Sequence, residues 1–74
     1  MKSRDLLNKL KWTSSLDDVK IYYIHRGAPD NVRVVSGKDI LELGPSFFTL
    51  KSGSKIPYHR LIRIEKEGDV LWFK

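Results

Sequence analysis

The order in which helical and strand patterns follow one another along the sequence most constrains the fold of this chain. One stretch with helical spacing comes first, and every later stretch with a regular pattern is typical of a strand. Leu6, Leu7 and Leu10 recur at the spacing that forms one apolar helix face, which predicts a helix over residues 3–11. A helix followed only by strands excludes alternating β-α-β units. The sequence therefore predicts an antiparallel α+β protein.

Six later stretches are rich in β-branched and aromatic residues and are separated by turn-forming residues. Gly-Ala-Pro-Asp-Asn at 27–31 suits a turn, so residues 19–36 are expected to form a hairpin. Pro57 lacks an amide donor and disfavours a central strand at its position. We expect a single domain over residues 1–74, with one N-terminal helix packed on a bent antiparallel sheet of about five or six strands. The predicted strands cover residues 19–26, 32–36, 40–43, 47–50, 58–66 and 70–74.

Alternation along the strands assigns side chains to faces. In the long strand predicted at 58–66, Ile62 and Ile64 are expected to face the core, which leaves His59 on the opposite face. In the first strand His25 is in phase with the apparent core, at the end of the strand.

The aromatic residues are expected to be mainly structural. Trp12 and Trp72 are predicted to lie in the core, and Phe47 and Phe48 to be split, one inward and one outward. The tyrosines are expected to be half-buried strand residues rather than platforms for bases, and they are Tyr22, Tyr23 and Tyr58.

The charge balance favours a polyanionic partner. Fourteen lysines and arginines stand against nine acidic residues, so the formal net charge is +5. The stretch between Glu42 and Glu65 contains no acidic residue, and a positive field is expected there. Its basic residues are Lys51, Lys55, His59, Arg60 and Arg63.

The residue inventory excludes several kinds of chemistry. Without cysteine there is no disulfide framework and no thiolate, and two histidines are too few for the usual four-ligand zinc site. The sequence contains neither a phosphate-binding loop nor a dinucleotide fingerprint nor a nucleophile elbow. We therefore expect no metal and no cofactor.

Hydropathy gives no reason to expect a membrane partner. No run approaches the roughly 20 apolar residues of a membrane helix, and the charged N-terminus lacks the apolar stretch of a signal peptide. A cytoplasmic location is expected. Glutamine is absent and methionine occurs once among many charged residues, which indicates a thermophile.

Both histidines are followed by arginine, in Tyr-Ile-His-Arg-Gly-Ala-Pro-Asp at 22–29 and Lys-Ile-Pro-Tyr-His-Arg-Leu-Ile at 55–62. The arginine fork matches phosphate oxygens, imidazole can also donate to phosphate, and exposed aromatic rings can stack a terminal base. Two such pairs could form one split anion site, although each could also be structural. The candidate RNA- and phosphate-binding residues are His25, Arg26, Gly27, Lys51, Lys55, Tyr58, His59 and Arg60.

His-Arg-Gly-Ala-Pro at 25–29, Ile-Pro-Tyr-His-Arg-Leu at 56–61 and the final Val-Leu-Trp motif resemble a small archaeal family of uncharacterised proteins. The family carries the RNA cyclic-group end recognition domain, and in its eukaryotic relatives that domain is joined to RNA-processing modules. The resemblance covers nearly the whole chain. It implies recognition of RNA ends that bear a 2′,3′-cyclic phosphate or a related group. The residues of this chain that match the motifs of the family are 25–29 and 56–60.

Three functions stay open from the sequence. The first is a module that binds single-stranded RNA or its phosphorylated end. The second is an enzyme whose paired histidines act as general base and general acid in opening a cyclic phosphate, with arginine stabilising the developing charge. The third is a protein-interaction module that uses a sheet edge or an apolar patch. RNA is the expected partner, and the sequence does not identify protein partners.

Overall fold

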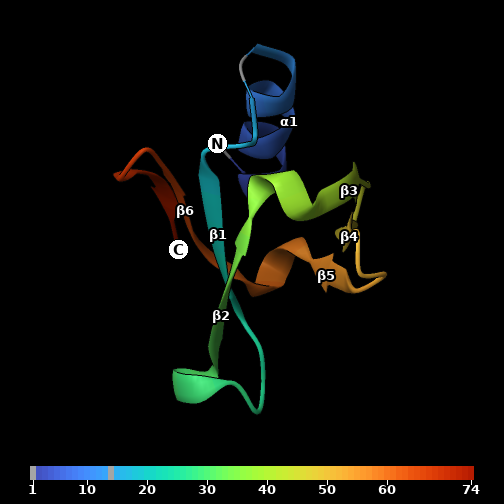
Figure 1. Cartoon of the computed structure of the whole chain (residues 1–74), viewed down its shortest axis with the longest axis vertical. Helices are drawn as coiled ribbons and strands as arrows, with labels where there is room; N and C mark the ends of the chain where they lie inside the picture. Colours follow the sequence, from blue (N-terminus) through green and yellow to red (C-terminus); the bar gives the residue numbers. More distant parts are fainter. Residues whose placement is uncertain (1, 14) are drawn as a thin grey trace.

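The computed structural model describes residues 2–13 and 15–74, with only the backbone described for Pro29. Figure 1 shows the helix at the upper end of the molecule and most of the strands below it. No helix in the described part of the chain is long and apolar enough to span a membrane. The helix and strands are α1 (Ser3–Thr13), β1 (Val19–Ile24), β2 (Val32–Ser36), β3 (Ile40–Leu43), β4 (Phe47–Leu50), β5 (Lys55–Pro57), β6 (Leu61–Lys66) and β7 (Asp69–Phe73).

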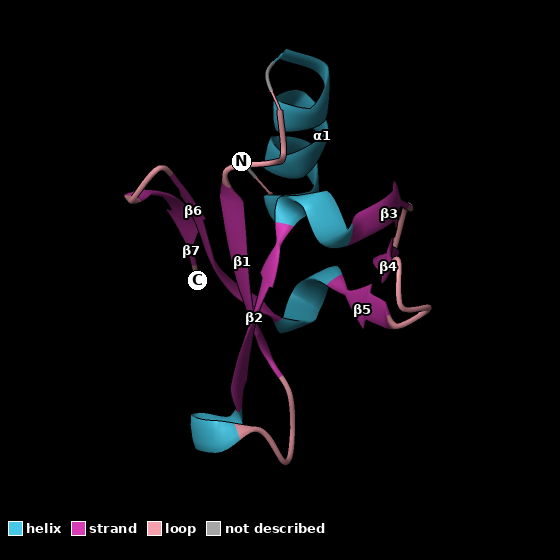
Figure 2. Cartoon of the chain, viewed as in Figure 1, coloured by secondary structure: helices cyan, strands magenta, loops and turns pink. Residues whose placement is uncertain are grey.

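Within the described residues, the seven strands form two antiparallel sheets (Figure 2). The larger sheet has the order β2-β1-β6-β7, and the smaller one has the order β3-β4-β5. The prediction of a single bent sheet with five or six strands is therefore wrong, although the protein is α+β.

Two short 3₁₀ turns connect the two sheets, and they explain why the strands do not form the single sheet that was predicted. Turn η2 (Gly37–Asp39) joins β2 to β3, and turn η3 (Tyr58–Arg60) joins β5 to β6. The Ser36 hydroxyl accepts a hydrogen bond from the Lys38 amide at 3.4 Å and so caps η2. Turn η3 takes the first three residues of the strand predicted at 58–66, so β6 begins later than expected.

The strand that sequence patterns missed is β5, which contains Pro57. Its position explains how proline is tolerated. β5 lies at the edge of the smaller sheet, where Pro57 pairs with Phe47 of β4. An edge strand needs ladder hydrogen bonds on one side only, so a missing amide on the outer side loses no bond.

One apolar core joins α1 to both sheets. α1, β1 and β4 each contribute residues from a single face, as the helical and strand periods require. In β1 the buried residues alternate with outward ones as predicted. The buried core residues are Leu7, Leu10, Val19, Ile21, Tyr23, Phe48, Leu50, Ile56, Leu61 and Ile64.

A bulge in β6 changes the faces predicted for that strand. Tyr22 pairs with Arg63, but the next residue, Tyr23, pairs with Leu61, so Ile62 has no partner on β1. The irregularity lets Leu61 and Ile64 both be fully buried, while Ile62 is only half-buried. Strict alternation puts Leu61 and Ile64 on opposite faces, and that prediction is wrong because a bulge resets the alternation.

The two tryptophans differ in their surroundings. Trp72 is half-buried and packs against the core, but Trp12 is 84% exposed and the prediction that it lies in the core is wrong. Leu10 is the last buried residue of α1, and Trp12 lies about 200° further round the helix. Of the paired phenylalanines, Phe48 is fully buried and Phe47 is half-buried, as predicted.

Gly37, the first residue of η2, is buried directly against the loop that precedes β1. A Cβ at this position would overlap the carbonyl oxygen of Leu16, which accepts a hydrogen bond from the Val19 amide at 3.1 Å. We expect Gly37→Ala to lower the free energy of unfolding by about 1–3 kcal/mol, as overpacking does. Urea denaturation measures the loss, with Lys38→Ala at the exposed neighbouring position as the control. Equal midpoints for the two variants would contradict the tight contact.

Candidate functional site

The pairing of β1 with β6 brings the two His-Arg motifs to one end of the larger sheet. Tyr23 of β1 pairs with Leu61 of β6. His25 comes two residues after Tyr23 and His59 two residues before Leu61, so in this antiparallel pair both lie beyond the same end. The strands do not continue there. The His25 amide donates to the Asn31 carbonyl at 2.9 Å within the hairpin loop, while His59 lies in turn η3.

The candidate residues nevertheless line different hollows. His25 and Gly27 line a cavity of about 390 Å³ at the hairpin tip, and Lys51 lines another of about 320 Å³. Tyr58 and His59 line a third and larger cavity. The remaining candidates, Arg26, Arg60 and Lys55, are exposed and line none of these cavities. Nζ of Lys55 lies 5.4 Å from the centroid of the Phe47 ring.

The larger cavity has a volume of about 570 Å³ and is called the basic cleft here. Four separate chain segments form it: the start of α1, the turn between β3 and β4, turn η3 with the start of β6, and the C-terminal end of β7. None of the described residues that line it is acidic, so its field is positive. Its basic and aromatic lining residues are Lys2, Arg4, Tyr58, His59, Trp72 and Lys74.

Hydrogen bonds hold the walls of the basic cleft together. The Tyr58 hydroxyl donates to the Gly44 carbonyl at 2.8 Å, which ties η3 to the turn between β3 and β4. Lys74 donates from its backbone amide to the Ile62 carbonyl at 2.9 Å and from Nζ to the His59 carbonyl at 2.7 Å. The end of β7 is therefore fixed beside η3, and the His59 side chain takes no part in these bonds.

Tyr58 is a neutral hydrogen-bond donor in the basic cleft. Burial raises the pKa of its phenol above the ordinary value, and the charge of nearby Arg4 offsets part of this rise. The proton is therefore retained at neutral pH, and the hydroxyl can remain bonded to the Gly44 carbonyl.

Sequence patterns missed four residues of this cleft. Trp72 was expected to be mainly structural, and no role was predicted for Lys2, Arg4 or Lys74. One signal was available, since Lys2 and Arg4 lie at the start of α1, where the helix dipole disfavours positive charge. Basic residues at an unfavourable position for helix stability are consistent with a role of these side chains in binding an anion.

The opposite end of the β1–β6 pair is acidic. A cavity of about 430 Å³ lies there, and Lys20 is the only basic residue among its described lining residues. The two cavities therefore differ in charge, with the basic cleft at one end of the β1–β6 pair and acidic side chains at the other. The acidic lining residues are Asp17, Asp18, Glu65 and Glu67.

Comparisons with known proteins agree over the whole chain. The family described as MJ1316 RNA cyclic group end recognition domain matches residues 1–74. A UPF0248 protein of Methanococcus vannielii is 39% identical, over 96% of this chain and 89% of the relative. The UPF0248 protein of Archaeoglobus fulgidus is 40% identical over 89% and 96%, and that of Pyrobaculum calidifontis is 40% identical over 92% and 91%.

No solved structure matches this chain. The family match covers every residue, and the archaeal relatives are aligned over most of both lengths. The chain therefore belongs to the family of the MJ1316 RNA cyclic group end recognition domain, the family that its sequence resembles.

Proposed function

We propose that this protein binds single-stranded RNA by its end and holds a terminal phosphate, either 2′,3′-cyclic or open, in the basic cleft. The observation that carries the proposal is the composition of this cleft. Basic side chains from three chain segments converge on it, two aromatic side chains line it, and no described lining residue is acidic. The description of the family supports RNA as the ligand.

The lining residues suit the parts of an RNA end. Arginine, lysine and imidazole donors can make charge-assisted hydrogen bonds to phosphate oxygens. Half-buried Trp72 and Tyr58 offer apolar surface for the terminal ribose and base, which RNA-binding proteins commonly contact through aromatic rings. A cyclic phosphate ties both ribose hydroxyls into one compact charged group, whereas a 3′-hydroxyl end offers no terminal charge.

The His25-Arg26 pair is proposed to contact the phosphate next to the terminal one. His25, Arg26 and Gly27 lie at the same end of the β1–β6 pair as the cleft but outside it. Arg60 is exposed directly after His59 and is placed at the rim in this proposal. Lys51 and Lys55 would add a diffuse attraction to the strand rather than a specific contact.

Binding is expected to depend on both the terminus and the salt concentration. Otherwise identical oligonucleotides ending in 2′,3′-cyclic phosphate, 3′-phosphate or 3′-hydroxyl should differ, with the hydroxyl end weakest because it lacks the group that the cleft holds. For single strands the logarithm of the affinity should fall with the logarithm of salt by about 0.7 for each phosphate contacted. Fluorescence anisotropy measures both dependences.

Two results would contradict the proposal. Equal affinity for the three ends would remove the terminal phosphate from the site. A ring-opened product in the same samples, formed at a rate that falls in a His59→Ala variant, would replace the binding function by catalysis. The His59 side chain makes no hydrogen bond in the cleft wall, so this variant should keep its fold.

A further inference from the structure

The outer face of the larger sheet, opposite the core, carries a row of four side chains. Tyr22 of β1 pairs with Val34 of β2 on one side and with Arg63 of β6 on the other, and Arg63 pairs with Phe73 of β7. Residues paired directly across strands point to the same face. We call these four residues, one from each strand, the sheet platform.

Three residues of the sheet platform are exposed, and Tyr22 is half-buried. Phe73 is 75% exposed, Val34 is 48% exposed, and the side chain of Arg63 is 47% exposed. Ile24, two residues beyond Tyr22 on the same face, is also exposed. Single exposed apolar residues are common on soluble proteins, but a contiguous row across a sheet marks an interaction surface.

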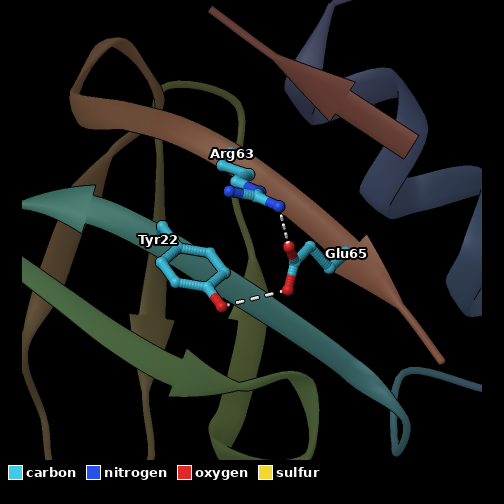
Figure 3. Close-up of polar contacts among 3 residues, drawn as sticks. All are labelled: Tyr22, Arg63 and Glu65. Atoms are coloured by element: carbon cyan, nitrogen blue, oxygen red, sulfur yellow. Dashed lines mark hydrogen bonds and ion pairs between the residues drawn. The ribbon is translucent and has the colours of Figure 1, made fainter. Parts of the chain in front are cut away.

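Polar contacts fix the middle of the row (Figure 3). The Tyr22 hydroxyl donates to Oε1 of Glu65 at 3.0 Å, and Arg63 forms an ion pair with Oε2 of the same carboxylate. The guanidinium carbon of Arg63 lies 5.5 Å from the centroid of the Tyr22 ring. The ion pair thereby compensates the charges of Glu65 and Arg63, and the Arg63 guanidinium is held over the face of the Tyr22 ring.

The charges and ring types on this face favour a single-stranded nucleic acid over a protein. Every nucleobase has a flat face that stacks on an aromatic ring, and arginine contributes both stacking and attraction for phosphate. Tyr22, Arg63 and Phe73 supply these groups along one row, with no unpaired carboxylate among them. Val34 and Glu65 line the acidic cavity, whereas Phe73 does not, so a polyanion is directed towards the Phe73 end of the row.

The sheet platform is also continuous with the basic cleft through edge strand β7. Trp72 and Lys74 line the cleft, and Phe73 between them points to the outer face. An RNA strand whose end occupies the cleft therefore needs only to pass round this edge to reach Phe73.

We propose that the sheet platform is a second RNA site, on which bases upstream of the terminal nucleotide stack on Phe73 and on the Arg63 guanidinium, which lies over the Tyr22 ring. The proposal rests on the proposed function for its ligand, RNA. It does not depend on the chemical nature of the end.

The test measures the affinity for RNAs of two and of eight nucleotides, each ending in a cyclic phosphate or in a hydroxyl. A further eight-nucleotide strand lacks the bases upstream of its terminal nucleotide. Wild-type protein should gain affinity with length only when the bases are present. Phe73→Ala should lower the affinity for the eight-nucleotide RNA by about 5- to 150-fold, the range for loss of one stacked base. Its affinity for the two-nucleotide RNA should stay unchanged.

Two further variants separate stacking from simple apolar contact. Phe73→Trp should keep the length-dependent affinity, and Phe73→Leu, which keeps apolar area without an aromatic face, should lose it. Leu41→Ala is the matched control, because Leu41 is 64% exposed but lies on β3 of the other sheet. Phe73 is largely exposed, so these variants should melt like wild type.

The outcomes distinguish the two proposals. If the base-free strand binds as tightly as the RNA, or if Phe73→Leu binds like wild type, the stacking site is wrong while end recognition can stand. If length and bases matter but the terminus does not, the stacking site stands and the proposed function is wrong. If Phe73→Ala leaves RNA binding unchanged but turns a dimer into a monomer in sedimentation, the face is a self-interface and the proposal is overturned.

Discussion

Phe48→Ala is expected to lower the free energy of unfolding by about 3–5 kcal/mol, the usual cost of removing a buried phenyl ring. Phe48 is the largest fully buried side chain, and it lies in the strand between β3 and β5. Its ring also packs against that of Tyr58, with centroids 5.8 Å apart. A domain of this length has a total stability of about 4–11 kcal/mol, so the variant should lose a large fraction of it.

The matched control is Phe73→Ala, which removes the same ring from a position that is 75% exposed. Urea denaturation followed by circular dichroism gives both free energies. A large loss for Phe48→Ala with almost none for Phe73→Ala is the expected pattern. Similar midpoints for the two variants would mean that Phe48 does not fill the core.

Arg4→Glu is expected to weaken binding to a cyclic-phosphate RNA end by about 10- to 100-fold, the equivalent of one charge-assisted hydrogen bond lost. The change replaces a donor that lines the basic cleft with a carboxylate that repels phosphate. An acidic residue in the first turn of a helix is favourable for the helix dipole, so loss of the fold should not be the cause.

Lys9→Glu is the control for Arg4→Glu, because it makes the same change in charge at another exposed position of α1. It should weaken binding only slightly, and its effect should vanish at high salt, where exposed charges are screened. Anisotropy titrations with the two oligonucleotide ends measure the difference. Equal losses for both variants would mean that net charge, rather than the cleft, governs binding.

Local pattern was sufficient to predict much of the secondary structure. β3 and β4 were predicted with their observed bounds, because clear strand patterns flank a Gly-Pro-Ser turn. The hairpin of β1 and β2 was also predicted, since the turn sequence Gly-Ala-Pro-Asp-Asn at 27–31 lies between its strands. The division into two sheets was not predicted. Tyr-His-Arg is compatible with both a strand and a 3₁₀ turn, and the packing of the sheets on one core selects the turn.

The candidate site was predicted only in part. Tyr58 and His59 were identified from their motif, and both line the basic cleft. Lys2, Arg4 and Lys74 were missed because they come from the two ends of the sequence and meet η3 only in the folded protein. Their proximity is a long-range property of the fold, which the spacing of residues along the chain does not encode.

The separation of acidic and basic ends has a kinetic consequence. A basic cleft and an acidic cavity at opposite ends of the β1–β6 pair contribute to a dipole moment, which turns the molecule in the field of an approaching polyanion. Such steering raises the fraction of collisions in which the correct surface arrives first, and so raises the association rate. The dissociation rate depends on the short-range contacts made after docking. Added salt should therefore slow the association of this protein with RNA more than it speeds dissociation.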